Sequence, residues 1–241
     1  MDTQELFKRK ALLWAGQFEN CCYLDSNNYI DKYGSYDALI AAGNLKTLSS
    51  TVGSAFSKLK SFYTDNRSWM FGLLTYELKD ETESLKSKNP DSLDFPALFF
   101  FIPEYLIAFK NGNIEVILGS VEILKDIEKV IPDEHSESLN ELCIQQRINR
   151  KSYLDALTEI RTHINRGDIY EVTFCQEFFA KNAQIDPLST FERLKELSPT
   201  PFSGYMKIGE KYILSASPER FLSKRGRTLI SQPIKGTARR G

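Results

Sequence analysis

The chain has 241 residues, of which 41% are hydrophobic and 26% are charged, and its formal net charge is −1. This composition is ordinary for a globular protein with a sizeable core, and the balanced charge argues against a nucleic-acid partner. No apolar run approaches the roughly 20 residues that a membrane span needs, and the N-terminus does not resemble a signal peptide. We therefore expect no membrane partner.

The cysteines and histidines limit the chemistry further. The four cysteines show neither CxxC nor zinc-like spacing, so we expect a reduced, cytoplasmic protein; they are Cys21, Cys22, Cys143 and Cys175. The two histidines, His135 and His163, lie far apart in the sequence. A histidine-based metal site or a Ser–His triad is therefore disfavoured.

The first part of the chain mixes helical and extended patterns. Apolar spacing predicts helices over 4–18, 36–42, 51–63 and 121–130. Strands are predicted over 22–24, 69–78 and 95–102. Asn111-Gly112 between the apolar runs 105–110 and 114–118 predicts a hairpin, because this dipeptide suits a tight two-residue turn.

A polar stretch, 132–140, marks the clearest boundary in the sequence. We therefore predict a first subdomain over 1–131, a linker over 132–147 and the start of a second domain over 148–241. In this last part we predict a helix over 152–166 ended by Gly167, a half-buried strand over 169–179, and a helix opened by a capping box at Ser189. Short strands are predicted over 202–208, 212–217, 220–222 and 228–231, joined by turns that contain Gly209 and Gly226.

Helices and strands do not alternate strictly in this reading, and several strands form hairpins. The sequence therefore predicts an α+β fold with largely antiparallel sheets, rather than a doubly wound parallel sheet. The aromatic runs Phe99–Phe101 and Phe178-Phe179 are assigned to the core. No Gly-rich phosphate loop is present, so nucleotide binding has little support.

The last stretch, 217–241, concentrates positive charge. It holds one acid, Glu219, and seven bases: Arg220, Lys224, Arg225, Arg227, Lys235, Arg239 and Arg240. Arginine suits bidentate contacts to carboxylates, so the cluster is a candidate pocket for a small dicarboxylate. A solvated surface hairpin is the alternative.

Lys235 and Glu219 are the candidate reactive residues of this stretch. A lysine that is partly desolvated beside other cations is more readily deprotonated, so Lys235 is a candidate nucleophile or base; an exposed turn lysine is the alternative. Glu219 is a candidate general acid or base, and an ion pair with Arg220 or Lys224 is its alternative. Gly236 and Thr237 offer backbone N–H groups and a hydroxyl to a carboxylate.

One face of the predicted strand 169–179 is polar. Glu171 and Thr173 lie on this face, which faces either the site or solvent.

Four ordered motifs then identify a family. GDIYEVTFCQEF (167–178), SPTPFSGYM (198–206), SASPERF (215–221) and PIKGTARRG (233–241) closely resemble the chorismate-utilising enzymes. This family includes anthranilate, aminodeoxychorismate, isochorismate and salicylate synthases. LDSN (24–27), WMFGLLTYELK (69–79) and FPALFFFIP (95–103) resemble the N-terminal part of the synthase component I group.

The resemblance implies a fold, a reaction and partners. It implies one interleaved α/β sandwich, chorismate as substrate, one Mg²⁺ near a substrate carboxylate, and ammonia from a separate glutamine amidotransferase subunit. Lys235 in Pro-Ile-Lys-Gly-Thr matches the aminodeoxychorismate synthases of the folate branch, whereas anthranilate synthases typically carry alanine. Lys235 is then the nucleophile and Glu219 the general acid, with Ser217, Gly236, Thr237 and Arg239 contacting the substrate.

The sequence departs from the family pattern in four places. Glu171 stands where isochorismate and salicylate synthases have a lysine base, which argues against that activity. Asp25 replaces the glutamate of the LLES motif in tryptophan-regulated members, and Pro201-Phe202-Ser203 replaces their SPYM element, which argues against tryptophan feedback. The stretch that carries the Mg²⁺-binding glutamates in the family has no counterpart here. We therefore expect an N-terminal fragment with its metal ligands beyond Gly241, or else a non-catalytic subunit.

Overall fold

The computed structural model describes residues 3–87, 89–132 and 142–234. The chain forms two compact units: residues 1–134 together with 187–241, and residues 135–186. The division predicted from the sequence, 1–131, 132–147 and 148–241, stays a prediction for the functional domains. In the structure, however, the strands after 187 pack with the first unit, so the two ends of the sequence interleave.

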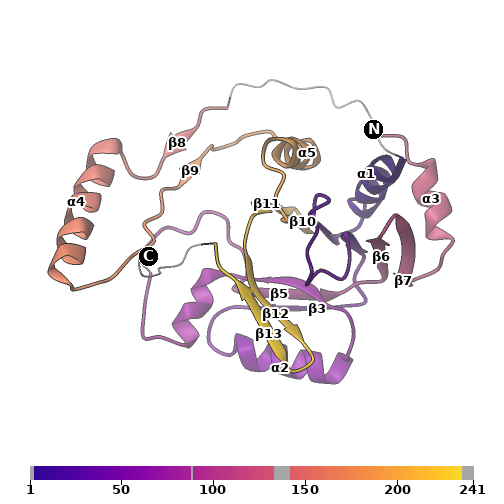
Figure 1. The fold of residues 1–241 in the computed structure, drawn as a ribbon, viewed down its shortest axis with the longest axis horizontal. Helices are drawn as coiled ribbons and strands as arrows, with labels where there is room; N and C mark the ends of the chain where they lie inside the picture. Colours follow the sequence, from indigo (N-terminus) through magenta and orange to yellow (C-terminus); the bar gives the residue numbers. More distant parts are fainter. Residues whose placement is uncertain (1–2, 88, 133–141, 235–241) are drawn as a thin grey trace. The chain divides into compact units, whose positions relative to one another are not determined.

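A six-stranded antiparallel sheet forms the centre of the first unit, in the order β11-β10-β1-β2-β6-β7. Figure 1 labels β6, β7, β10 and β11 of this sheet. Its strands are β1 (Asn20–Asp25), β2 (Ala38–Ala42), β6 (Tyr105–Lys110), β7 (Asn113–Leu118), β10 (Phe202–Ile208) and β11 (Lys211–Ser217). Strand β1 pairs with β2 on one side and with β10 on the other, so Cys22 lies opposite both Ala41 and Met206. This pairing joins segments far apart in the sequence.

Alternation along these strands gives the sheet two apolar faces. One face packs against helices α1 (Thr3–Ala15), α3 (Ile123–Lys129) and α5 (Pro187–Leu197), and includes Tyr23 and Phe109. The other face, which includes Cys22 and Leu106, packs against a three-stranded sheet in the order β3-β5-β4. These strands are β3 (Lys46–Ser50), β4 (Phe71–Leu74) and β5 (Leu98–Ile102).

Helix α2 (Ala55–Asn66) and the 3₁₀ helix η1 (Tyr76–Glu81) share a smaller apolar cluster with β5. The Glu81 carboxylate accepts hydrogen bonds from the backbone N–H groups of Gly53 and Ala55, at 2.7 and 2.8 Å. These donors lie at the start of α2, where N–H groups have no partner inside the helix. Glu81 therefore caps α2 from another element. These hydrogen bonds, that from Ala55 most of all, lower the pKa of the Glu81 carboxyl group.

Two predicted hairpins are confirmed. Asn111 and Gly112 have φ of 51° and 79°, as the two-residue turn between β6 and β7 requires. Strands β12 (Arg220–Arg225) and β13 (Thr228–Gln232) form a separate two-stranded ribbon, whose turn begins at Gly226 with φ of 58°.

The second unit holds a short ribbon and one helix. Strands β8 (Gln145–Gln146) and β9 (Phe178–Phe179) pair, and helix α4 runs over Arg150–Arg166. The Asn149 side chain caps α4 by accepting from the backbone N–H of Ser152, and Gly167 ends the helix with φ of 82°. The predicted C-terminal glycine is thus confirmed, although none of the residues of α4 is buried.

One predicted element is of the wrong type, and two predicted strands are longer than those in the structure. The helix predicted over 36–42 is strand β2, because pairing with β1 and β6 outweighs the helix preference of its alanines. The strand predicted over 69–78 ends at Leu74, which lies opposite Leu98, the first residue of its partner strand β5. The strand predicted over 169–179 is confined to β9, since β8 supplies only two residues for pairing.

The core assignments are confirmed in part. Phe101 is fully buried and Phe99 is 7% exposed, as predicted. Phe178 is 62% exposed, so its assignment to the core is wrong; no residue of α4, the helix of the same unit, is buried either. Helix α5 begins at Pro187, two residues before the predicted capping box, and proline is favourable at a first helical position.

The α+β class with antiparallel sheets is confirmed. Among the helices that the structure describes, none is both long and apolar enough to span a bilayer.

Candidate active site

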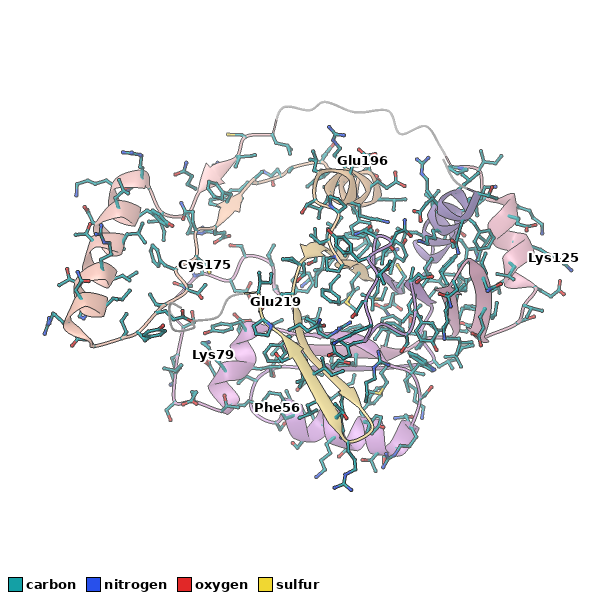
Figure 2. All side chains as sticks on the ribbon, in the orientation of Figure 1. Phe56, Lys79, Lys125, Cys175, Glu196 and Glu219 are labelled. Atoms are coloured by element: carbon teal, nitrogen blue, oxygen red, sulfur yellow. The ribbon has the colours of Figure 1, made fainter. Side chains whose placement is uncertain are left out.

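Glu219 lies in the two-residue connection between β11 and β12, two residues after Ser217 (Figure 2). The backbone N–H of Glu219 donates to Ser217 Oγ at 3.3 Å, and Ser217 Oγ donates to the Glu219 carbonyl at 3.2 Å. The Glu219 side chain is exposed, and among the described residues no ion pair joins it to Arg220 or Lys224. The ion pair with Arg220 or Lys224 that was the alternative for Glu219 is therefore absent among the described residues, and the Glu219 carboxylate is accessible.

Arg220 is instead held by other groups. Its guanidinium donates to the Asp31 carboxylate and to Gln232 Oε1, and it lies 4.8 Å from the centre of the Phe202 ring. The hydrogen bond from Arg220 lowers the pKa of Asp31. Arg225 donates to the Tyr33 carbonyl at 2.9 Å. Two arginines of the basic stretch thus fix the β12–β13 ribbon to the loop after β1, which stabilises the chain on the C-terminal side of Glu219.

A cavity of about 790 Å³ lies under this loop. It brings together Asp25 and Ser26 of the LDSN segment and Pro201-Phe202-Ser203, the two places where the sequence departs from the tryptophan-regulated pattern. The Asn27 side chain joins them by donating to Ser203 Oγ at 2.7 Å. Ser26 Oγ is buried with no hydrogen-bond partner among the described residues. The cavity therefore has a polar wall that a ligand or water would satisfy.

A buried charge network lies behind this wall. The Asp25 carboxylate pairs with Lys195 of α5, lies 3.8 Å from Lys8 Nζ of α1, and accepts from Tyr23 Oη at 2.5 Å. Burial alone would raise the pKa of Asp25, but Lys195 and Lys8 outweigh it, so the pKa is lowered. Burial together with the Asp25 charge raises the pKa of Tyr23 well above its ordinary value.

Sequence reasoning missed both lysines of this network. Lys8 lies four residues before Leu12 and Lys195 lies four residues after Phe191, so each shares the buried face of its helix. A lysine within an apolar helical stripe was the available signal, because such a residue is rarely buried without a charged partner.

The remaining predicted site residues are not assembled with Glu219 by the described structure. Lys235, Gly236, Thr237 and Arg239 lie outside the described residues. Glu171 and Thr173 are exposed and belong to the second unit. The predicted roles of all six therefore stay predictions.

The described residues do not offer a donor set for Mg²⁺. Within 3–87, 89–132 and 142–234, no three His, Cys, Asp or Glu side chains gather where they could hold a metal ion. All four cysteines are free thiols, and burial raises the pKa of Cys21 to about 11. No catalytic step is therefore assigned to a metal bound by these residues.

Comparison with known proteins agrees with the fold and the motifs. The chain is 28% identical over 187 residues to anthranilate synthase component 1 of Thermus thermophilus, an alignment that covers 70% of this chain and 39% of that protein. It is 26% identical over 170 residues to aminodeoxychorismate synthase component 1 of Klebsiella aerogenes, covering 69% and 38%. The chain thus spans well under half the length of these relatives.

The crystal structure of anthranilate synthase component I from Streptococcus pneumoniae superimposes with a TM-score of 0.66 at 18% identity, covering 83% of this chain and 54% of that one. The fold is thus that of a synthase component I. The chorismate binding enzyme family model matches residues 19–241. The chain belongs to the chorismate binding enzyme family.

Proposed function

We propose that the complete protein converts chorismate to 4-amino-4-deoxychorismate, the precursor of 4-aminobenzoate in the folate branch. The observation that carries this proposal is Lys235 within Pro-Ile-Lys-Gly-Thr, in a chain whose family is chorismate binding. Similarity to an aminodeoxychorismate synthase, at 26% identity, supports it. A glutamine amidotransferase partner would supply ammonia in the cytoplasm.

In the proposed reaction, the neutral amine of Lys235 attacks the chorismate ring and the 4-hydroxyl group leaves. Glu219 gives its proton to this hydroxyl, which departs as water, because a protonated oxygen is a better leaving group. The lysine nitrogen loses a proton to solvent on forming its bond, and Glu219 regains its proton from solvent. Ammonia then displaces the lysine, and the proton that the incoming nitrogen loses passes to the departing lysine nitrogen, so Lys235 returns as a free amine.

Two features support these roles. Arg239 and Arg240 follow Lys235 closely in the sequence, and neighbouring cations favour the neutral amine that the attack requires. The Glu219 carboxylate is accessible and is not engaged by Arg220, which is held by Asp31 and Gln232. Ser217, Gly236, Thr237 and Arg239 would hold the substrate carboxylates, and Glu171 and Thr173 would face the same site.

Anthranilate synthesis is the second candidate, because several of the similar curated proteins carry that name. The two candidates differ in whether the amino group takes the place of the 4-hydroxyl group of chorismate, which is the step proposed for Lys235. Lys235 favours the first, since alanine is typical of anthranilate synthases at this position.

The test uses the protein expressed from its complete gene, with chorismate, Mg²⁺ and ammonium, and resolves the products by mass spectrometry. We expect aminodeoxychorismate; anthranilate as the product would reject the proposal. Lys235→Ala should abolish the product and also any chorismate-derived mass adduct on the protein. Glu219→Gln should lower kcat by about 10²–10⁴-fold, the usual contribution of a general acid.

Lys224→Ala is the control, because Lys224 is an exposed lysine of the β12–β13 ribbon, eleven residues before Lys235 in the sequence. It should keep the parent rate. Parent activity in Lys235→Ala would reject the covalent role.

A further inference from the structure

The short connection that carries Glu219 joins two different sheets of the first unit (Figure 2). Strand β11 ends at Ser217 and lies at one edge of the six-stranded sheet, whereas β12 begins at Arg220 in the separate β12–β13 ribbon. Among the strands that the structure describes, no ladder pairs this ribbon with the sheet. Inside the ribbon, the register shifts between Arg220 and Ser223, so the ladder is irregular just after the connection. The position of the start of β12 therefore depends on side-chain contacts.

Arg220 makes these contacts. Its guanidinium lies 4.8 Å from the centre of the Phe202 ring, and Phe202 lies opposite Ser217 in the β10–β11 ladder. The residue that follows Glu219 therefore packs on the strand that holds the other end of the connection. The same guanidinium donates to the Asp31 carboxylate, in the loop after β1.

The Asp31 carboxylate is itself fixed by its own turn. Asp31 Oδ1 accepts from the backbone N–H of Tyr33 at 2.9 Å, and the Asp31 carbonyl accepts from the N–H of Gly34 at 2.9 Å. Asp31 Oδ2 accepts from Arg220, and the side chains of Asp31 and Arg220 are 18% and 12% exposed. Solvent therefore screens this pair less than it screens a surface ion pair, and a hydrogen bond between two charged groups is stronger than one between neutral groups.

We propose that Asp31 is a positioning residue for Glu219, an inference that rests on the proposed function, in which Glu219 is the general acid. Asp31 acts through Arg220 in two ways. It fixes the residue that follows the acid, and it keeps the guanidinium paired away from the Glu219 carboxylate. A general acid works only within hydrogen-bond reach of the group that takes its proton, so a small displacement lowers the rate. The effect of Asp31 should therefore require Glu219.

The experiment uses the protein expressed from its complete gene and measures kcat and KM for product formation from chorismate and ammonium. Asp31→Asn keeps an oxygen for the Tyr33 N–H but turns an amide NH₂ toward Arg220, so that two donors face each other. We expect kcat to fall about tenfold, because the acid is displaced, and KM to change less than about twofold, because Glu219 acts on the leaving group. In a Glu219→Gln background, Asp31→Asn should change kcat less than about twofold.

Asp91→Asn is the matched control. Asp91 Oδ1 accepts from the backbone N–H two residues on, that of Leu93, at 3.0 Å, as Asp31 accepts from Tyr33, but Asp91 lies in the loop between η1 and β5. This variant should keep the parent kcat.

Arg220→Gln breaks the same contact from the other side, and it keeps the test decisive where Asp31→Asn does not fold. It should lower kcat as much as Asp31→Asn does, and the two changes together should lower it no further. Near-ultraviolet circular dichroism checks the fold of each variant.

The outcomes separate this inference from the proposed function. If Asp31→Asn lowers kcat by the same factor with and without Glu219, the positioning role is overturned while Glu219 stays the acid. An equal loss in Asp91→Asn, or parent kcat in both Asp31→Asn and Arg220→Gln, overturns it as well. Parent kcat in Glu219→Gln alone would overturn the acid role in the proposed function, and the positioning role with it.

Discussion

Replacing Asp25 by asparagine removes the one buried negative charge between α1, α5 and the central sheet. The change keeps the shape of the side chain but leaves Lys195 and Lys8 without their shared carboxylate. Loss of one partner from a buried pair costs about 3–5 kcal/mol of unfolding free energy. Lys8 keeps Glu5 and Lys195 is 19% exposed, so the lower end, about 3 kcal/mol, is expected.

For a domain of this size, 1 kcal/mol corresponds to about 2–4 °C in Tm, so Asp25→Asn should lower the Tm by about 6–12 °C. The effect should depend on pH in a defined direction. The pKa of Asp25 is lowered below its ordinary 3.8 in the folded chain. Its stabilisation is therefore fully present above that value and is lost as pH falls through the lower folded pKa. The difference in Tm between parent and variant should be constant from about pH 7 to about pH 5 and shrink below about pH 4.

Asp126→Asn is the matched control, because Asp126 also pairs with a lysine, Lys129 at 2.8 Å, but at exposed positions of α3. It should change the Tm by a small fraction of the effect at Asp25. The double variant Asp25→Asn, Lys195→Met should lose less than the sum of its single variants, because the second change removes a cation that the first leaves unpaired. Equal Tm losses at Asp25 and Asp126, or a pH-independent difference, would refute the reasoning.

Two further predictions concern the first unit: a glycine packed closely against a neighbouring strand, and the carboxylate that caps α2. Gly72→Ala should lower the free energy of unfolding by about 3 kcal/mol in a denaturant melt, because the added Cβ would lie 2.1 Å from the Phe99 carbonyl oxygen. Gly204→Ala is the control, because its Cβ would meet no atom closer than 3.6 Å. Equal losses in the two variants would contradict the steric argument. Glu81→Gln should lower the Tm at pH 7, since Glu81 accepts from the backbone N–H of Ala55 at the start of α2. The pKa of Glu81 is lowered, so this difference should fade as pH drops below about 4; a difference that persists in acid would argue against the charge effect.

Local turn chemistry made the hairpins predictable from the sequence. Asn111-Gly112 and Gly226 adopt the positive φ that their turns require, and Gly167 does the same at the end of α4. At such positions the backbone conformation depends on the residue itself, because non-glycine side chains other than asparagine rarely tolerate it. Residues elsewhere in the chain do not alter that local preference, so the turns can be predicted from the sequence.

Long-range pairing explains what the sequence did not predict. The alanines of β2 form a strand only because β1 and β6 supply hydrogen bonds on both sides. The polar face that includes Glu171 and Thr173 alternates like a strand, yet β8 supplies partners only for Phe178 and Phe179. Propensity and periodicity describe one segment at a time, whereas a sheet depends on which distant segment becomes its neighbour.

The same distinction applies to the candidate active site. The SPERF motif identifies Glu219 as a candidate acid, but the position of its backbone depends on residues from the other end of the sequence. Strand β11 reaches Ser217 through pairing with β10, which itself pairs with β1. On the other side, Arg220 is held by Asp31, in the loop that follows β1. The N-terminal segment therefore positions the connection that carries Glu219, which gives a physical reason for the two ends of the chain to fold as one unit.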